Sequence, residues 1–104
     1  MSKKIDNEVV GTYSIIRTYS AGVWFGKVYK KAKDEIILKN ARRLYYWKTN
    51  GGISLSEVSL TGLSDESKVT ASVNKIWLKS IEIIPCTEIA ISSIKEKKDY
   101  VYTR

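Results

Sequence analysis

The hydrophobic positions near the start of the chain fall into two strand-like runs. Residues 9–19 and residues 23–29 are both rich in β-branched and aromatic side chains, which favour extended backbone. Between the two runs, Ala21 and Gly22 form a turn-prone pair. We therefore predict a β-hairpin built from these two segments.

A third strand is predicted after this hairpin. The stretch 30–34 is polar and is expected to be a loop, and apolar residues resume at 35–39. The strand then continues through Trp47, with a bulge expected at Asn40-Ala41. The sequence Thr-Asn-Gly-Gly at 49–52 predicts a turn that closes the strand.

The pattern changes after this turn. Residues 54–57 read Ser-Leu-Ser-Glu, the form of a capping box, and predict a short helix at 54–61 that ends at Gly62. A polar loop is expected at 64–68. Two further strands are then predicted at 69–78 and at 81–85.

A second helix is predicted from Glu88 to about Lys98, with Thr87 as its N-cap. Its apolar side is expected to dock on the sheet through Ala90, Ile91 and Ile94. Together the elements predict a mainly β fold, either a small antiparallel sheet or a partly open barrel, with a short mid-chain helix and a C-terminal helix.

Length and composition predict one domain. A chain of 104 residues with 43% hydrophobic residues is expected to form a single domain, 1–104, with 1–7 as a flexible tail. No apolar run approaches the roughly 18 residues of a membrane span, and the polar start lacks the core of a signal peptide. We therefore expect a cytoplasmic protein with no membrane partner. The single Cys86 excludes an intramolecular disulfide and is expected to be semi-buried.

The charge of the chain is uneven. Residues 1–52 hold eleven Lys and Arg against four Asp and Glu, whereas residues 53–104 hold seven of each, so the net charge of +7 belongs to the first half. Eight of the eleven aromatic residues lie there as well. This bias indicates an anionic partner, which leaves nucleic acid, a nucleotide, an anionic membrane or an acidic protein.

Few residues in the chain suit catalysis. The sequence has no histidine and one cysteine, and it lacks the motifs of phosphate-binding loops, metal sites and serine hydrolases. Its acidic residues, such as Asp34-Glu35 and Asp65-Glu66, are more simply solvated charges beside turns and loops. We therefore expect a binding protein with no catalytic residue, metal or cofactor.

The segment 39–48 is the strongest candidate for ligand contact, because it sets two arginines beside three aromatic rings. Guanidinium groups match phosphate oxygens, and ring faces stack on nucleobases. On a strand, Arg43, Tyr45 and Trp47 share one face, while Arg42 and Leu44 share the other with Tyr46 and Lys48. Burying either face would bury an arginine, which is costly unless that arginine meets an anion or an acid. The alternative is a half-buried strand with solvated arginines, and a site between subunits would satisfy both faces.

The hairpin turn is a second candidate. Its small residues, Ala21, Gly22 and Gly26, allow a ligand or backbone to approach closely, and Ser20 with adjacent amides would suit a phosphate. The alternative is an ordinary turn. Trp77, an isolated apolar residue in a predicted strand, is expected to belong to the core.

Four segments of the chain resemble a widespread family of small tailed-phage proteins. They are Arg17–Gly26, Leu38–Trp47, Leu55–Gly62 and Ile81–Thr87, and the similarity covers roughly residues 13–94. We associate this family with anti-CBASS cyclic-nucleotide sponges, which sequester the cyclic dinucleotide signal of bacterial immunity without cleaving it. The resemblance implies a cGAMP-like ligand, a homo-oligomer (a tetramer) with sites at subunit contacts, and action in the cytoplasm of the infected bacterial cell.

Within these segments, chemistry selects eight candidate ligand-binding residues: Arg17, Tyr19, Ser20, Trp24, Arg42, Arg43, Tyr45 and Trp47. Two other functions remain open from the sequence. A small β-rich domain with stacking rings and positive charge also suits single-stranded nucleic acid, and a third possibility is an inhibitor of an acidic host protein.

Overall fold

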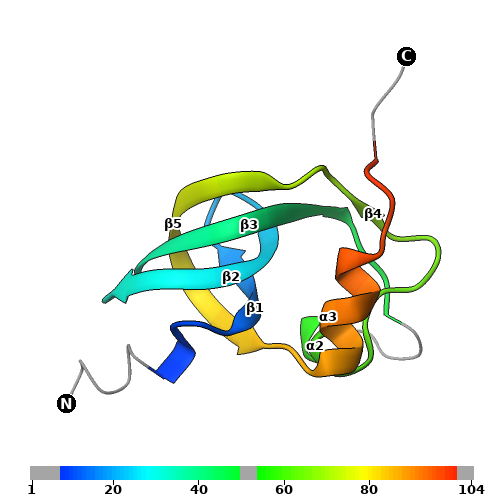
Figure 1. Cartoon of the computed structure of the whole chain (residues 1–104), viewed down its shortest axis with the longest axis horizontal. Helices are drawn as coiled ribbons and strands as arrows, with labels where there is room; N and C mark the ends of the chain where they lie inside the picture. The colour runs from blue at the N-terminus through cyan, green and yellow to red at the C-terminus, as the bar shows by residue number, and fades with distance from the viewer. Residues whose placement is uncertain (1–7, 50–53, 101–104) are drawn as a thin grey trace.

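The computed structural model describes residues 8–49 and 54–100, and these form a mainly β fold with two helices (Figure 1). The elements in chain order are β1 (Tyr13–Thr18), β2 (Val23–Ala32), β3 (Glu35–Tyr46), α2 (Leu55–Thr61), β4 (Lys68–Val69), β5 (Val73–Pro85) and α3 (Glu88–Lys95). This confirms the predicted fold class of an antiparallel β fold with a mid-chain and a C-terminal helix. Neither helix of the described part has the length and apolar character that a bilayer span requires.

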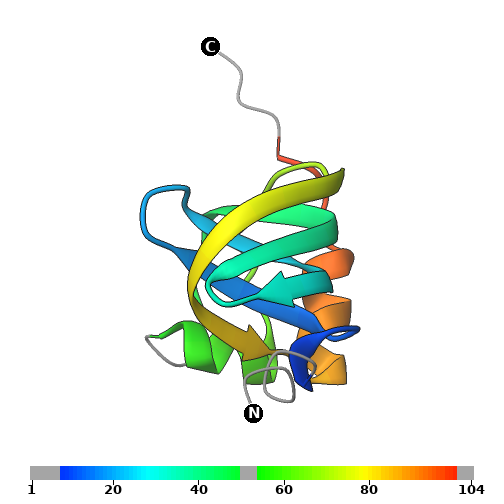
Figure 2. The same cartoon turned by 90° about the vertical axis from the view of Figure 1, so that its left-hand side faces the viewer.

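The strands pair in a partly ring-like sheet. β1 pairs with β2 and with β5, and β3 also pairs with β2 and with β5, all antiparallel. The short β4 adds to the end of β3. Figure 2 shows the long β5, in yellow, curving across the other strands. Most strand edges in the described residues are therefore already paired.

Several predicted boundaries were wrong. β1 begins at Tyr13 and not at residue 9. β2 continues through the stretch expected to be a loop, and only Lys33 and Asp34 form the turn, with Lys33 at a φ of 55°. The strand predicted from residue 69 begins only at Val73, and Val69 belongs to β4. From Val73 to Pro85 the two predicted strands are one continuous β5, because Ser80 stays in the ladder and donates its backbone N–H to the Asp34 carbonyl at 2.7 Å. α3 ends at Lys95, three residues before Lys98. The tail 1–7 and most of the turn 49–52 lie outside the described residues.

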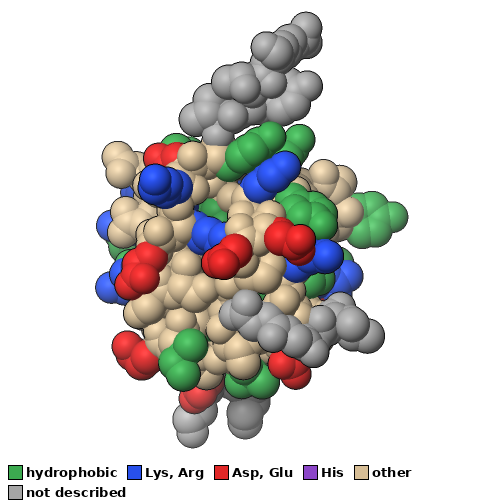
Figure 3. All heavy atoms as spheres, turned by 90° about the vertical axis from the view of Figure 1, so that its right-hand side faces the viewer, with side chains coloured by type: hydrophobic (Ala, Val, Ile, Leu, Met, Phe, Trp, Pro, Cys, Tyr) green, Lys and Arg blue, Asp and Glu red, His purple; other side chains and the backbone are tan. Residues whose placement is uncertain are grey.

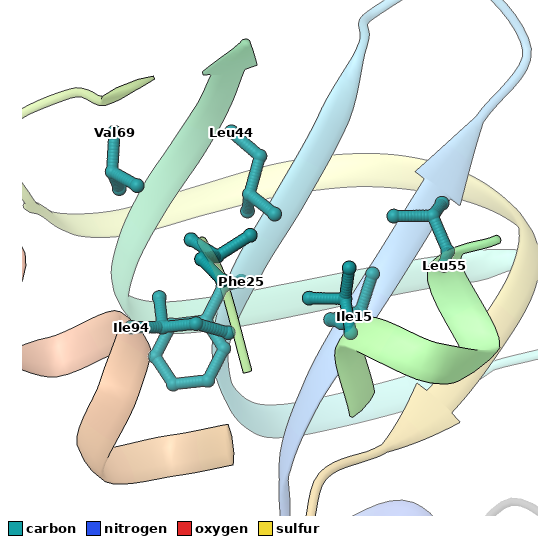
Figure 4. Packing of buried hydrophobic residues seen from close by; sticks show 8 residues of the cluster. Ile15, Phe25, Leu44, Leu55, Val69 and Ile94 are labelled. Atoms are coloured by element: carbon teal, nitrogen blue, oxygen red, sulfur yellow. The ribbon is translucent and has the colours of Figure 1, made fainter. Parts of the chain in front are cut away.

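Alternation along the strands divides the core into two clusters. Ile16 and Trp24 belong to a cluster made of strand residues, whereas their neighbours Ile15 and Phe25 belong to a cluster that includes helix residues. Consecutive strand residues point to opposite faces, so each strand contributes to both clusters. Figure 4 shows the second cluster, where Phe25 of β2 lies against Ile94 of α3.

The predicted bulge in β3 is confirmed and changes which residues face inward. Asn40 has a φ of 51°, and the register between β2 and β3 shifts there, opposite Gly26. Before the bulge Leu38 belongs to the strand cluster, and after it Ala41 does. Because of this extra residue, the side chains of β3 that face the strand cluster stand at even-numbered positions before the bulge and at odd-numbered positions after it. Arg42 is thereby directed to the face that the helices cover.

The two helices cover one end of the sheet. Thr87 caps α3 as predicted, since its hydroxyl accepts a hydrogen bond from the Ala90 N–H, and Ala90 and Ile94 are fully buried. The predicted capping box of α2 does not form, because the Ser54 side chain makes no cap hydrogen bond. In Figure 1 the β2–β3 hairpin extends away from both helices. At the hairpin end, the outer face of the sheet is therefore not covered by the helices.

Candidate functional site

Arg42 is buried, and its side chain makes hydrogen bonds within the protein. Its side chain is 7% exposed, and it donates hydrogen bonds to the carbonyls of Thr70 at 2.8 Å and Ile94 at 2.8 Å. It also donates to the Asp99 carboxylate at 2.9 Å and, at 3.3 Å, to the carbonyl of Lys95. Ile94 and Lys95 end α3, so Arg42 satisfies carbonyls that a helix terminus leaves unpaired. This predicted ligand-binding residue holds the helix on the sheet.

Arg43 points the other way. It is exposed, and its guanidinium carbon lies 4.7 Å from the centroid of the Trp24 ring. Trp24 itself is buried in the strand cluster and donates its indole N–H to the Ala21 carbonyl at 3.0 Å. A Cβ added at Gly22 would lie 3.7 Å from Arg43 Nε, an ordinary contact, so it is the φ of 89° at this turn that favours glycine. Trp24 therefore offers no free face at this end of the sheet.

The remaining predicted residues lie at separate places. Tyr19 is 90% exposed and Ser20 is exposed, both in the β1–β2 turn, while Arg17 forms an ion pair with Glu82 at 2.9 Å. Tyr45 is stacked on Tyr100 with ring centroids 5.4 Å apart. Trp47 packs against the helix-side core cluster.

The eight predicted residues thus do not converge on one pocket. Arg42 and Trp47 belong to the helix side, and Arg43 to the hairpin-turn end with the exposed Tyr19. The face that bears α3 carries acidic and basic side chains side by side (Figure 3). No concentrated positive patch is visible on that face.

A row of three lysines crosses the outer face of the sheet, from β2 over β3 to β5. Lys27 of β2 lies directly opposite Lys39 of β3, and Lys39 lies directly opposite Lys75 of β5. Directly paired residues point to the same face of a sheet, and like charges in such positions repel each other. The fold therefore maintains an unfavourable arrangement of three positive charges on its outer surface.

Aromatic rings accompany this lysine row. The ammonium groups of Lys39 and Lys75 lie 4.0 Å and 5.2 Å from the centroid of the Tyr29 ring, and that of Lys30 lies 5.5 Å away. Trp77, directly opposite Ile37, is 65% exposed on the same face. The expectation that Trp77 belongs to the core was wrong, because β5 directs its odd-numbered residues outward here and Leu78 inward.

Two cavities flank Tyr29. One, of about 390 Å³, is lined by Lys27, Val28 and Lys39 together with Val10, Gly11 and Tyr29. The other, of about 400 Å³, is lined by Val10, Tyr29, Lys30, Lys31, Ala32, Glu35, Ile36, Ile37 and Trp77. The first is the more basic, and the second has an apolar floor between two rings. We call the surface formed by Lys27, Tyr29, Ile37, Lys39, Lys75 and Trp77 the lysine face.

Sequence reasoning missed the lysine face because its residues come from three strands. Lys27 and Tyr29 are two positions apart on β2, as are Ile37 and Lys39 on β3 and Lys75 and Trp77 on β5. This repeated pairing of a lysine with an apolar residue, in strands whose intervening positions are apolar, was the available signal. This pattern indicates a shared surface only when the three strands are known to be neighbours.

A third cavity, of about 380 Å³, lies between α3 and the sheet and is lined by Tyr13, Phe25, Asn40, Arg42, Ser72, Lys95, Lys97 and Asp99. A hydrogen bond from Lys95, and then its positive charge, lower the pKa of Tyr13 against the opposing effect of burial. Burial raises the pKa of the Cys86 thiol to about 12, so this thiol is poorly reactive at neutral pH. Within 8–49 and 54–100, no group of three or more His, Cys, Asp or Glu residues is arranged to hold a metal ion.

No curated protein and no solved structure matches the chain significantly. A family model matches residues 11–94, a span that reaches from the loop before β1 into α3 and contains the lysine face. The chain therefore belongs to the family described as a domain of unknown function, DUF6948.

Proposed function

We propose that this protein binds a cyclic dinucleotide on the lysine face and sequesters it without cleavage. The observation that carries the proposal is the row of three directly opposed lysines beside the exposed rings of Tyr29 and Trp77. A surface that keeps like charges together is stabilised when an anion binds between them. Exposed rings add stacking surface for the bases of the same ligand.

The spacing of the lysine row suits a ligand with two phosphates. Neighbouring strands are about 4.8 Å apart, so the outer lysines, Lys27 and Lys75, stand on backbones about 10 Å apart, with Lys39 between them. In the proposed complex, the phosphodiesters lie over the lysines and one base enters the cavity between Tyr29 and Trp77. Tyr29 lines both cavities and separates the phosphate-binding part from the base-binding part.

The proposed role is immune evasion by a phage protein. Capture of the cyclic dinucleotide would withdraw the messenger of CBASS signalling in the cytoplasm of an infected bacterial cell. No bond needs to be made or broken in this role, and the lysine face consists of cationic, aromatic and aliphatic side chains. A homotetramer with several such faces would hold several ligands per assembly.

A second candidate is binding of single-stranded nucleic acid. The exposure of Trp77 favours it, because a ring that is 65% exposed on the outer face of the sheet is available to the bases of a chain that passes across the sheet. Such a ligand would extend beyond the two cavities.

Calorimetry against a panel of ligands tests both candidates. The panel contains cyclic dinucleotides, cyclic trinucleotides and oligodeoxythymidylates of increasing length, each at two salt concentrations. Our proposal predicts tight binding of a cyclic dinucleotide, with a smaller dependence on salt than a long strand shows, because the lysines meet only two phosphates. Affinity that rises with strand length and falls steeply with salt would favour the second candidate instead. Binding of none of these ligands would refute both.

Recovery of the ligand tests sequestration. After incubation with a saturating cyclic dinucleotide, the protein is denatured by heat and the released ligand is analysed by chromatography. We expect the intact cyclic compound in full yield. Linear dinucleotide or mononucleotide in amounts that grow with incubation time would show catalysis.

A further inference from the structure

Among the described residues that line the cavity between Tyr29 and Trp77, one is acidic. This residue is Glu35, and the other charged residues that line the cavity are Lys30 and Lys31. Ile37 forms the floor of the cavity between the two rings, because it lies directly opposite Trp77 on β5 and opposite Lys30 on β2. An apolar floor with aromatic walls suits a flat base, and a carboxylate at its rim suits the donors on the edge of that base.

Glu35 is held in place by its backbone. It is the first residue of β3, directly after the two-residue turn, and it pairs with Ala32 on one side and Lys79 on the other. Among the residues that the structure describes, the Glu35 carboxylate makes no hydrogen bond or ion pair. An acid on a lysine-rich surface that forms no such pair retains both oxygens for a ligand.

We propose that Glu35 makes this cavity selective for guanine, an inference that rests on the proposed function. An ionised carboxylate only accepts hydrogen bonds. The Watson–Crick edge of guanine presents two adjacent donors, N1–H and N2–H, which match its two oxygens. Adenine presents one donor and one acceptor on that edge, so its N1 would face a carboxylate oxygen without a hydrogen between them. A bidentate contact of this kind discriminates between bases by about 1–3 kcal/mol, or about fivefold to 150-fold in affinity.

Cytosine is a weaker match because its exocyclic amine offers a single donor group beside an acceptor. A purine also covers more of the floor formed by Ile37 and reaches both rings. The cavity of about 400 Å³ has room for one such base with its sugar at the opening. Guanine is therefore the base that satisfies the carboxylate, the floor and the walls together.

The experiment compares two ligands that differ only in their bases, cyclic di-GMP and cyclic di-AMP, by calorimetry on the full chain. The wild-type protein is expected to bind cyclic di-GMP about tenfold more tightly. In Glu35→Gln this ratio should fall below about threefold, because an amide offers one acceptor and one donor and fits adenine as well as guanine. Far-ultraviolet circular dichroism checks that the variant is folded.

Asp34→Asn is the matched control. Asp34 is the neighbouring acid, and it lines a different cavity together with Lys33 and Ser80. Its substitution makes the same change of charge and should leave the ratio between the two ligands within about twofold of wild type.

Three results would overturn the inference. Equal affinity of the wild-type protein for both ligands would remove guanine selectivity and leave the proposed function standing. An unchanged ratio in Glu35→Gln would show that another group selects the base. Binding of neither ligand would overturn this inference together with the proposal of a cyclic dinucleotide site.

Discussion

Arg42 and Arg43 are adjacent in sequence and have different roles in the structure. Arg42 is buried against the C-terminal end of α3, where carbonyl groups and Asp99 accept its hydrogen bonds. Arg43 is exposed and lies over the ring of Trp24. The burial cost of Arg42 is offset because its charge meets an acid and the negative end of a helix dipole. Loss of Arg42 should therefore lower the free energy of unfolding more than loss of Arg43.

We predict that Arg42→Ala lowers the free energy of unfolding by about 2–4 kcal/mol, because it leaves helix-terminal carbonyls and the Asp99 carboxylate without their donor. Arg43→Ala should lower it by about 1 kcal/mol or less, the usual contribution of an exposed cation–π contact. Urea denaturation followed by tryptophan fluorescence measures both. Equal effects of the two substitutions would contradict the assignment of Arg42 as the residue that holds α3.

A second residue-scale prediction concerns the centre of the lysine row. Lys39 has a lysine directly opposite it on each side, so Lys39→Ala should weaken binding of a cyclic dinucleotide by about tenfold, as expected for loss of a charge-assisted hydrogen bond. It should change stability by about 1 kcal/mol or less, because it removes both the repulsion between the lysines and the cation–π contact of Lys39 with Tyr29.

Lys98→Ala is the charge-matched control for this measurement. Lys98 is exposed and follows α3, far along the chain from the three strands of the lysine row. Its loss should change calorimetric affinity by about twofold or less, through the overall charge alone. Equal weakening by both variants would indicate a diffuse electrostatic effect in place of a defined site.

At the scale of elements, Gly62 determines how closely α2 and α3 approach. It follows the last residue of α2 with a φ of 91°, a conformation that L side chains rarely adopt. A Cβ added at this position would lie 2.4 Å from the Cβ of Ser93 in α3. The helices also meet through the hydroxyl of Thr87, which donates to the Leu60 carbonyl at 2.8 Å. A side chain at Gly62 would therefore push the two helices apart.

We predict that Gly62→Ala lowers the free energy of unfolding by about 2–4 kcal/mol, the sum of a strained backbone and a forced displacement of α3. Gly11→Ala is the control, because Gly11 has the same φ of 91° and nothing within 4 Å of an added Cβ. Gly11→Ala should lower the free energy of unfolding by about 1 kcal/mol, because only the backbone is strained. If thermal or urea denaturation shows the same loss for both variants, the packing of α2 against α3 does not depend on Gly62.

At the scale of the whole molecule, exposed apolar residues on β5 favour self-association. Ile81 and Val73 are 55% and 41% exposed on this strand, outside the lysine face to which Trp77 belongs. Large apolar side chains gathered on the surface of a small protein commonly mark a contact with another molecule. Trp24 and Phe25 are buried in the two core clusters and are not available for such a contact. The exposed apolar residues of β5 are therefore the expected contact.

We predict an oligomer whose mass by light scattering is several times the 11.8 kDa of one chain, with a tetramer as the expected form. Ile81→Ser should reduce this mass by weakening the contact through β5. Ile89→Ser is the matched control, since Ile89 is an isoleucine on α3 that is 68% exposed. A strictly monomeric wild-type protein that still binds a cyclic dinucleotide would show that the site lies within one chain.

The sequence by itself determined the features that depend on neighbours along the chain. The runs of β-branched and aromatic residues predicted β1, β2 and β3, because they favour extended backbone wherever they occur. Thr87 predicted the start of α3 because its hydroxyl satisfies a nearby N–H. The bulge at Asn40 was also predictable, since asparagine tolerates a positive φ better than most residues.

Only the tertiary structure decided which residues lie together on a face. Lys27, Lys39 and Lys75 form a row because of the register between three strands, and that register is set by contacts between residues distant in sequence. The same pairing exposes Trp77 and carries β5 through Ser80 without a break. Alternation along one strand fixes which side chains share a face, but the surroundings of that face come from the other strands and helices. The candidate site is an outcome of strand pairing, and for this reason it was missed from the sequence.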